Sequence, residues 1–464
     1  MDSASPSLRA RRDRIARTWS GEHSGPTVVA SGLPVAIAGT DQYHDFHAHP
    51  DFAYLSGAAY PGSVLAFDPR EGWNLFVPLA SIDDRIWVGD GESLEGAATT
   101  TGIERPRPLS ALASWLESHR GEPLAVLGNH DILQDAAAYG IRGWAPLEPE
   151  LDVEASARLT ERIAESRRTK DPSELSRMRA AANATAAGHR AAFRLARPGM
   201  TERALQVEVE AEFFRNGAAR TAYGSIVGGG PNGAVLHFSP TARPFADGEI
   251  VLMDAAAEYE GYAADVTRTF PVGERFSGIQ RDLYALVLGV QQQAVHDARP
   301  GVEYRDLHLA ASLRIAEGLV SLGILRGSPA DLVEQDVHAL FFPHGLGHML
   351  GLATHDAGGC LAGRTPSDRF GLKWLRADLP LQPGHVVTIE PGVYFIRALL
   401  TDPFRRSRYA SQVNWDMVEQ MLDFGGIRIE DDVLVTADGP EMLTASIPRE
   451  LEEIEELRRE GLRG

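Results

Sequence analysis

The feature that most constrains the fold is a pair of apolar runs that each reach an aspartate and are joined by a short turn. Residues 249–254 have the pattern of a buried strand, and residues 261–270 have that of a strand returning beside it. Residues 258–261 favour the turn between them. The midpoint of Asp254 and Asp265 falls in this turn, so an antiparallel hairpin would place the two aspartates opposite each other, with Cβ atoms about 5 Å apart.

Two adjacent buried anions repel each other, so this arrangement requires a bound proton or cations between the two carboxylates. The alternative is that one aspartate ends its strand in solvent, because aspartate is common at turns. The hairpin alone leaves both interpretations open.

Further acids and histidines extend the aspartate pair into a larger set. Glu390 and Glu430 each follow a β-branched run typical of a strand. His344, His348 and His355 stand in a glycine-rich stretch, and glycine lets backbones approach closely. Any one of these side chains could have a structural role. Together they favour a site.

Four carboxylates and one imidazole form a hard, oxygen-dominated set of candidate ligands. Such a set can neutralise two divalent metal ions and hold a water or hydroxide between them, which is typical of a hydrolase. Oxygen-rich ligation favours Mn²⁺, although Co²⁺, Zn²⁺ or Fe²⁺ would also suit these residue types.

The composition excludes several other classes of protein. The counts of 45 Lys+Arg and 64 Asp+Glu give a net charge of −19, which opposes non-specific binding to nucleic acid or anionic membranes. The two lysines, Lys170 and Lys373, do not stand in a Gly-Lys-Ser/Thr phosphate loop. The single cysteine, Cys360, excludes an internal disulfide and fits a reducing compartment. The sequence shows no signal peptide or membrane-spanning run, so we expect a cytoplasmic protein.

The pattern of the chain changes near residue 150. Before it, short apolar runs alternate with turns and a helix-like stretch, which predicts a small α/β domain. After it, the chain is alanine-rich with helical periodicity. We therefore expect a first domain at 1–150 and a second at 158–464, with the boundary at 148–158.

Two similar segments point to an internal duplication. Residues 196–201 and 298–303 share an Ala-Arg-Pro-Gly string, and an amphipathic helix pattern follows each. Two copies are too few for a repeat array. Chance similarity between helices rich in alanine and arginine is the alternative explanation.

The acid and histidine motifs resemble those of a known family. The strings Met-Asp-Ala, Ala-Asp-Val-Thr-Arg-Thr-Phe, His-Gly-Leu-Gly-His, Ile-Glu-Pro-Gly and Gly-Ile-Arg-Ile-Glu-Asp-Asp are similar to the metal-binding motifs of the pita-bread metallopeptidases that cleave Xaa-Pro bonds. The resemblance spans residue 170 to about residue 443, and the preceding domain resembles the N-terminal domain of prolidases and aminopeptidases P. It implies an α/β (α+β) chain in which a small N-terminal α/β domain precedes a pita-bread catalytic domain of two related halves.

The resemblance implies a dinuclear centre with two divalent ions, with Asp265 and Glu430 bridging them. The five implied ligands are Asp254, Asp265, His348, Glu390 and Glu430. In the implied mechanism a metal-bridging hydroxide attacks the carbonyl of the first residue, and Glu390 accepts the proton of the attacking water and returns it to the leaving nitrogen. His237 or His355 would stabilise the oxyanion.

Other residues resemble substrate-side positions of the family. Thr267, two residues after Asp265 and therefore on the same strand face, resembles a donor that orients the carboxylate. Arg428 would tune the charge of the site or contact substrate. The remaining implied substrate-side residues are His344, Tyr223 and Ile226.

The expected substrates are small peptides with proline in second position, and Arg376 bears on their length. Arg376 resembles the arginine with which longer prolidases bind the proline carboxylate, an anion that suits a planar guanidinium. The insertion from about residue 396 to residue 423 also resembles those prolidases. We therefore favour an Xaa-Pro dipeptidase. An ordinary surface ion pair is the alternative role for Arg376.

The sequence is also compatible with several other functions. The nearest is aminopeptidase P, which releases the first residue from longer Xaa-Pro peptides, and another is a non-catalytic pita-bread binding protein. Hydrolysis of organophosphorus esters would be a side activity. The string around His44, His47 and His49 could be an amidohydrolase metal motif, but the chain does not read as a (β/α)₈ barrel. A polar loop that reaches a neighbouring subunit is the other interpretation, and a homodimer is the expectation of the family.

Overall fold

The computed structural model describes residues 6–128 and 151–463, and the chain divides into two compact units, 1–167 and 168–464. Helix α7 (Val153–Arg168) lies almost wholly in the first unit. The expected end of the first domain, residue 150, lies outside the described residues. The domain boundary at 148–158 therefore stays a prediction.

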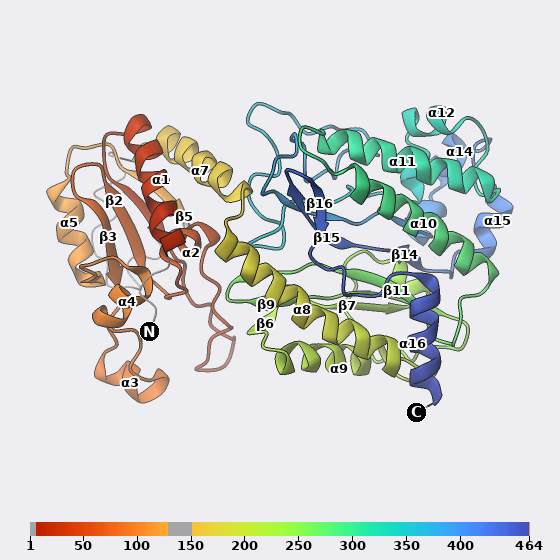
Figure 1. Ribbon diagram of the computed structural model, residues 1–464, viewed down its shortest axis with the longest axis horizontal. Helices are drawn as coiled ribbons and strands as arrows, with labels where there is room; N and C mark the ends of the chain where they lie inside the picture. Colours follow the sequence, from red (N-terminus) through yellow and green to blue (C-terminus); the bar gives the residue numbers. More distant parts are fainter. Residues whose placement is uncertain (1–5, 129–150, 464) are drawn as a thin grey trace. The chain divides into compact units, whose positions relative to one another are not determined.

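A five-stranded mixed sheet in the order β4-β3-β2-β1-β5 organises the first unit (Figure 1). Its strands are β1 (Thr27–Ala30), β2 (Val64–Asp68), β3 (Gly72–Val77), β4 (Arg107–Pro108) and β5 (Ala125–Gly128). The helices before α7 in its described residues are α1 (Pro6–Glu22), α2 (Pro50–Ser56), α3 (Ile82–Val88), α4 (Leu94–Thr101) and α5 (Leu112–Ser118). Val28, Phe76 and Trp115 contribute to the apolar core between the sheet and α5. The expected small α/β domain is confirmed.

The second unit combines short antiparallel sheets with four long helices. The helices are α8 (Pro172–Leu195), α9 (Glu202–Arg215), α10 (Gly278–Asp297), α11 (Tyr304–Ser321), α12 (Pro329–Glu334), α13 (Arg397–Leu400), α14 (Pro403–Arg408), α15 (Trp415–Gln420) and α16 (Leu451–Arg463). Its strands are β6 (Arg220–Thr221), β7 (Ile226–Gly229), β8 (Ile250–Asp254), β9 (Ala257–Tyr259), β10 (Tyr262–Ala263), β11 (Thr267–Pro271), β12 (Val386–Ile389), β13 (Gly392–Tyr394), β14 (Gly426–Arg428), β15 (Asp431–Thr436) and β16 (Gly439–Met442).

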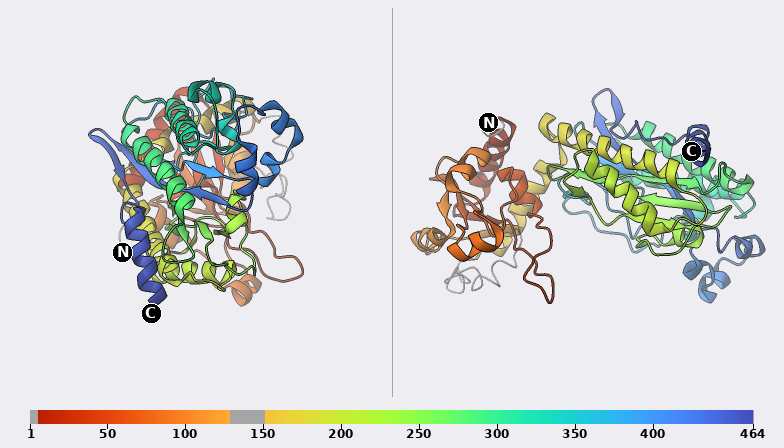
Figure 2. Two further views of the ribbon diagram at one scale, coloured as in Figure 1. Left: turned by 90° about the vertical axis from the view of Figure 1, so that its right-hand side faces the viewer. Right: turned by 90° about the horizontal axis from the view of Figure 1, so that it is seen from below.

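The same order of elements occurs twice in the second unit. The helices α8 and α9 precede the sheet β11-β8-β7, and α10 and α11 precede the sheet β12-β15-β16. Figures 1 and 2 show the four helices on one side of the strands. One large apolar core joins helices and strands of both halves. This architecture confirms the pita-bread expectation, and it leaves the opposite side of the strands available for polar residues.

The hairpin around Asp254 forms, but its register differs from the expected one. The turn falls on Glu260 and Gly261, which both have positive φ, at 46° and 84°. The hairpin is therefore centred one residue later than the midpoint of the two aspartates. As a result Asp254 pairs with Thr267, and not with Asp265. Asp265 stands two residues before Thr267, so its side chain lies on the same face and diagonally across from Asp254, and both aspartates line one cavity.

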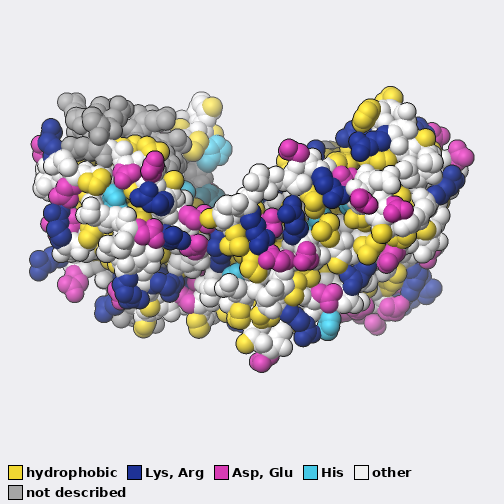
Figure 3. Space-filling view, turned by 90° about the horizontal axis from the view of Figure 1, so that it is seen from above, with side chains coloured by type: hydrophobic (Ala, Val, Ile, Leu, Met, Phe, Trp, Pro, Cys, Tyr) yellow, Lys and Arg dark blue, Asp and Glu magenta, His cyan; other side chains and the backbone are white. Residues whose placement is uncertain are grey.

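The surface carries both signs of charge despite the net negative balance. Lys/Arg and Asp/Glu side chains are interspersed on the face drawn in Figure 3. Among the described residues, no helix has both the length and the apolar character needed to cross a membrane.

Candidate metal centre and active site

The five candidate ligands converge on one cavity of about 860 Å³ in the second unit. Asp254 ends β8, Glu390 follows β12, and Glu430 lies between β14 and β15. The Nε2 atom of His348 lies 3.3 Å from Oδ2 of Asp265 and 3.6 Å from Oε1 of Glu390. One ligand atom each of Asp265, His348 and Glu430 lie within 4.8 Å of one another. The structure therefore brings together acids that are far apart in the sequence.

The His348 ring shows that this cluster suits a cation. Its Nδ1 lies 2.9 Å from the carbonyl oxygen of Met349, which can only accept, so Nδ1 carries the proton of the neutral ring. The Nε2 lone pair then faces two carboxylates. This is unfavourable unless a proton or a metal ion lies between them. Burial acts to lower the pKa of His348, but the adjacent carboxylates of Asp265 and Glu390 together outweigh burial, so the pKa is raised above its ordinary value.

The carboxylates of the cluster resist ionisation in the absence of a cation. Burial, and then the neighbouring Asp265, raise the pKa of Glu430 well above its ordinary value. Burial also raises the pKa of Glu390 to about 7. The pKa of Asp254 is raised chiefly by burial, against the opposing charge of Arg428. Such a group of buried acids is stabilised by divalent cations, so the residues fit the dinuclear site that the sequence predicts.

Hydrogen bonds from Arg428 link Asp254 directly, and Glu430 through Thr267. Its guanidinium donates to Oδ2 of Asp254 at 2.7 Å and to the Thr267 hydroxyl at 2.8 Å. The Thr267 hydroxyl in turn donates to Oε2 of Glu430 at 2.6 Å. Thr267 was expected to orient the carboxylate that precedes it on its strand. The structure gives its hydrogen bond to Glu430, because Glu430 lies beside β11.

Tyr394 is a site residue that the sequence reasoning missed. Its hydroxyl accepts from Arg428 at 2.8 Å and lies 2.8 Å from Nε2 of His344. Because Nδ1 of His344 donates to the Gly345 carbonyl, Nε2 accepts from Tyr394. The sequence feature that could have identified Tyr394 is its position four residues after Glu390, in a β-branched and aromatic run. Burial lowers the pKa of His344 to about 3, so this ring is neutral.

The glycines of the His-Gly-Leu-Gly-His motif are explained by close backbone packing. A Cβ at Gly347 would collide with the Thr388 carbonyl and the Tyr304 hydroxyl. A Cβ at Gly345 would lie 3.0 Å from the carbonyl oxygen of Trp374. Only glycine lets this loop lie so near β12, and this contact directs His348 into the cavity.

The other predicted substrate-side residues also line the cavity. The His355 ring stands edge-on to His348 with centroids 4.5 Å apart, and burial lowers the pKa of His355 to about 4. The Tyr223 hydroxyl donates to Oδ1 of Asp254 at 2.5 Å, and Ile226 pairs with Asp254 across the sheet. The lining residues that the sequence predicted are His237, His344, His355, Tyr223, Ile226, Arg376 and Arg428.

Arg376 differs from the neighbouring arginines. Arg364, Arg369 and Arg405 all form ion pairs. Among the described residues, the Arg376 guanidinium forms neither a hydrogen bond nor an ion pair. The alternative of an ordinary surface ion pair is therefore wrong. An uncommitted guanidinium in a cavity is suited to a substrate anion.

The histidine-rich segment of the first unit does not form a barrel site. It lies between β1 and α2, in a unit whose sheet is open and five-stranded. His49 is the N-cap of α2 and accepts from the backbone N–H of Asp51. His44 and His47 are exposed. The amidohydrolase interpretation is wrong, because these histidines do not follow a strand of a (β/α)₈ barrel.

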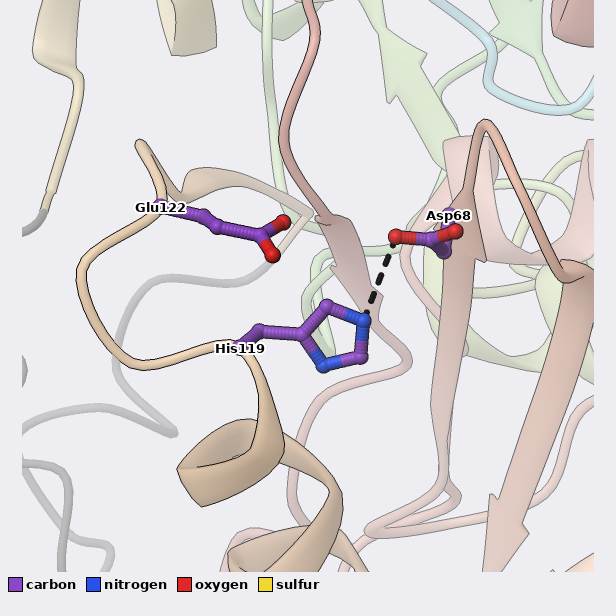
Figure 4. A group of neighbouring side chains, drawn as sticks. All are labelled: Asp68, His119 and Glu122. Atoms are coloured by element: carbon purple, nitrogen blue, oxygen red, sulfur yellow. Dashed lines mark hydrogen bonds and ion pairs between the residues drawn. The ribbon is translucent and has the colours of Figure 1, made fainter.

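A second group of potential ligands, Asp68, His119 and Glu122, lies in the first unit (Figure 4). Here Arg70 already supplies the positive charge. Its guanidinium donates to Oδ2 of Asp68 at 3.0 Å and to Oε2 of Glu122 at 2.8 Å. Nε2 of His119 lies 3.2 Å from Oδ2 of Asp68. We interpret the group as an ion-pair network that joins β2 to the end of α5.

Comparison with known proteins agrees with this geometry. Residues 176–437 match metallopeptidase family M24, and residues 8–123 match the aminopeptidase P N-terminal domain. The chain belongs to metallopeptidase family M24. The M24 match contains all five candidate ligands and most of the described second unit.

Relatives and solved structures cover nearly the whole chain. A probable Xaa-Pro aminopeptidase pepP of Aspergillus terreus is 34% identical over 435 residues, which cover 91% of this chain and 90% of the relative. A protein of the same name from Penicillium rubens is 31% identical over 97% of both chains. The Pseudomonas aeruginosa aminopeptidase PepP superposes with a TM-score of 0.83 at 29% identity, over 100% of both chains. Aminopeptidase P of E. coli, solved with the inhibitor Pro-Leu, gives a TM-score of 0.82 at 30% identity over 100% of both chains.

Proposed function

We propose that this M24 metallopeptidase is an Xaa-Pro aminopeptidase, which hydrolyses the bond between the first residue of a peptide and a following proline. The observation that carries the proposal is the convergence of four acids and His348 on one cavity, with the His348 lone pair facing two carboxylates. Relatives over nearly the full length support the choice of substrate, since their names specify Xaa-Pro peptides.

We assign the two metal ions to Asp254, Asp265, His348, Glu390 and Glu430. When bound, divalent ions supply Lewis acidity and make a nucleophile of water at neutral pH. Mn²⁺ remains the favoured metal from the oxygen-rich ligand set, with Co²⁺, Zn²⁺ and Fe²⁺ as alternatives. Arg428 donates a hydrogen bond to Asp254, and Thr267 donates one to Glu430. These bonds orient the two carboxylates.

Glu390 and the cavity histidines move or hold protons. Glu390 takes the proton of the attacking water and delivers it to the proline nitrogen, which must be protonated because proline has no amide N–H. His355 is neutral at pH 7, since its pKa is lowered to about 4 by burial, and it can donate a hydrogen bond to the oxyanion. His237 lines the same cavity and is the second candidate for this role.

The comparisons favour the aminopeptidase alternative over the dipeptidase that the sequence motifs predict. The matched relatives and solved structures carry aminopeptidase names. Arg376 nevertheless lines the cavity, and its guanidinium has no ion-pair partner in the part of the chain that the structure describes. We therefore propose that Arg376 binds the carboxylate of short substrates, so that Xaa-Pro dipeptides are accepted beside longer peptides.

A turnover series tests the proposal. The protein is reconstituted with Mn²⁺, and kcat/KM is measured for Ala-Pro, Ala-Pro-Ala and Ala-Ala-Ala. We expect cleavage of Ala-Pro-Ala, weaker cleavage of Ala-Pro, and none of Ala-Ala-Ala. Arg376→Ala should reduce cleavage of Ala-Pro more than that of Ala-Pro-Ala. Arg397→Ala is the matched control, because Arg397 pairs with the exposed Asp423. Failure to cleave either proline peptide with Mn²⁺, Co²⁺, Zn²⁺ or Fe²⁺ would contradict the assignment.

A cytoplasmic location and a homodimer stay predictions. The single cysteine fits a reducing compartment, and dimerisation is an expectation of the family. Sedimentation of the purified protein would measure the subunit number.

A further inference from the structure

An exposed tryptophan stands at the rim of the M24 cavity. Trp374 lines the same cavity as His348 and Glu390, yet 59% of its surface is exposed. Large aromatic side chains are usually mostly buried, so an exposed tryptophan within a cavity lining calls for a reason. The proposed reaction leaves this ring unused.

The backbone that carries Trp374 is firmly anchored. Arg369 donates to the carbonyl oxygens of Val333 and Glu334 at 3.0 and 3.1 Å, and it pairs with Asp336. Just beyond, Nε2 of His308 donates to the Gly371 carbonyl at 2.8 Å. The exposed ring is therefore presented by a fixed segment, and such preorganisation reduces the entropy lost when a ligand binds.

The Trp374 carbonyl also lies against the metal-ligand motif. A Cβ added at Gly345 would meet that carbonyl oxygen at 3.0 Å and the Cα of Leu375 at 3.2 Å. The tryptophan segment thus runs directly past the His-Gly-Leu-Gly-His loop. A peptide whose scissile bond lies near His348 would pass this segment as it leaves the cavity.

Positive charge flanks the ring. Nζ of Lys373 lies 5.1 Å from the Trp374 ring centroid and 5.5 Å from that of Phe370. The guanidinium of Arg376, two residues further on, is uncommitted among the described residues. An apolar ring with Lys373 against it and Arg376 in the same cavity lining suits an apolar residue followed by a terminal carboxylate.

We propose that Trp374 forms the subsite for the residue after proline, and that the enzyme prefers Xaa-Pro-Xaa peptides with an apolar or aromatic third residue. The proposal rests on the proposed Xaa-Pro activity. Trp374 is a specificity-determining residue here. It contacts the third residue of the peptide and leaves the cleavage of dipeptides unaffected.

The test compares Ala-Pro, Ala-Pro-Asp and Ala-Pro-Phe as substrates of the Mn²⁺-loaded protein and its Trp374→Ala variant. We expect wild type to prefer Ala-Pro-Phe to Ala-Pro-Asp. Trp374→Ala should lower kcat/KM for Ala-Pro-Phe about tenfold, mainly through KM, and change that for Ala-Pro less than about twofold. Trp374→Phe should restore most of the loss. Phe404→Ala is the matched control, since Phe404 is 68% exposed and does not line the cavity.

Two kinetic results would each overturn the subsite: an unchanged KM for Ala-Pro-Phe in Trp374→Ala, or an equal loss for Ala-Pro and Ala-Pro-Phe. A change of subunit number in Trp374→Ala, measured by sedimentation, would also overturn it and assign the ring to a protein interface. If wild type cleaves no proline peptide, the proposed function fails separately. Calorimetric titration of the metal-loaded protein with Ala-Pro-Phe and Ala-Pro then decides whether Trp374 binds the third residue.

Discussion

Lys170 and Asp356 form a buried ion pair, and Asp356 directly follows the cavity histidine His355 in the chain. Their Nζ and Oδ2 atoms lie 3.0 Å apart, and each side chain is 1% exposed. A Cβ at Gly351 would collide with the Asp356 carboxylate, so the loop folds tightly around the pair. The pair fixes the residue next to His355 without entering the cavity.

Lys170→Met should destabilise the protein by about 1.5–3 kcal/mol, because it removes a buried charge-assisted hydrogen bond to the Asp356 carboxylate. Lys373→Met is the matched control, since the only other lysine is exposed and its loss should cost about 1 kcal/mol or less. Urea unfolding measures both. Lys170→Met combined with Asp356→Leu should recover part of the loss. Equal stability of the two single lysine variants would contradict the assigned role of the pair.

Thr267→Val should lower kcat/KM roughly 10–100-fold and weaken Mn²⁺ binding by a similar factor. The variant keeps the shape of the side chain but removes the hydroxyl that donates to Glu430 and accepts from Arg428. Thr401→Val is a control at an exposed hydroxyl that bonds a helix carbonyl. Metal titration by calorimetry separates a loss of binding from a loss of turnover, and unchanged Mn²⁺ affinity would refute the positioning role.

Removal of metal with a chelator should abolish activity and make stability depend on pH. The raised pKa of Glu390, about 7 against an ordinary 4.5, means that the folded metal-free protein binds more protons than the unfolded chain between these values. The stability that protonated Glu390 contributes to the metal-free protein is therefore lost as the pH rises from 4.5 to 7. Glu390→Gln should reduce this slope in the metal-free protein, while also removing activity. Thermal unfolding at pH 5, 6, 7 and 8 measures the effect, and identical slopes in both proteins would rule it out.

His308 should produce the opposite pH dependence. Burial lowers the pKa of His308 to about 4 from 6.5, so the unfolded chain binds a proton that the folded protein does not. Stability is unaffected above pH 6.5 and falls by roughly 1.4 kcal/mol per pH unit as the pH drops toward 4. His308→Gln can keep the donor to Gly371 but cannot titrate in this range, so it should flatten this slope. Chemical denaturation of both proteins at pH 7, 6 and 5 provides the comparison. If the stability of His308→Gln fell as steeply with decreasing pH as that of wild type, the role assigned to His308 would be wrong.

The identity of the site residues could be predicted from the sequence because each stands in a distinctive local context. Asp254 and Glu390 end apolar strands, and His348 lies in a glycine-rich motif whose close packing requires small residues. The register of the hairpin could not be predicted. The register depends on the positive φ of Glu260 and Gly261. Residues 258–261 favour a turn at more than one position, so local preference does not select this one.

Contacts between distant segments also escaped prediction. Tyr394 enters the site because β13 pairs with β14, which sets it near Arg428 and His344. The hydroxyl of Thr267 bonds Glu430 because β11 lies next to the strand end that carries Glu430. Neither contact has a signature in the spacing of the chain.

The chemistry of this protein follows from its amino-acid sequence, which supplies the acids and histidines and the local turns, glycines and strands that present them. Tertiary packing sets which of these groups meet, what Arg428 bonds, and that Trp374 stands exposed in the cavity lining beside an Arg376 that pairs with no described residue. The physical reason is that local preferences act over a few residues, whereas burial, ion pairing and register are set by segments that become neighbours only when the core packs.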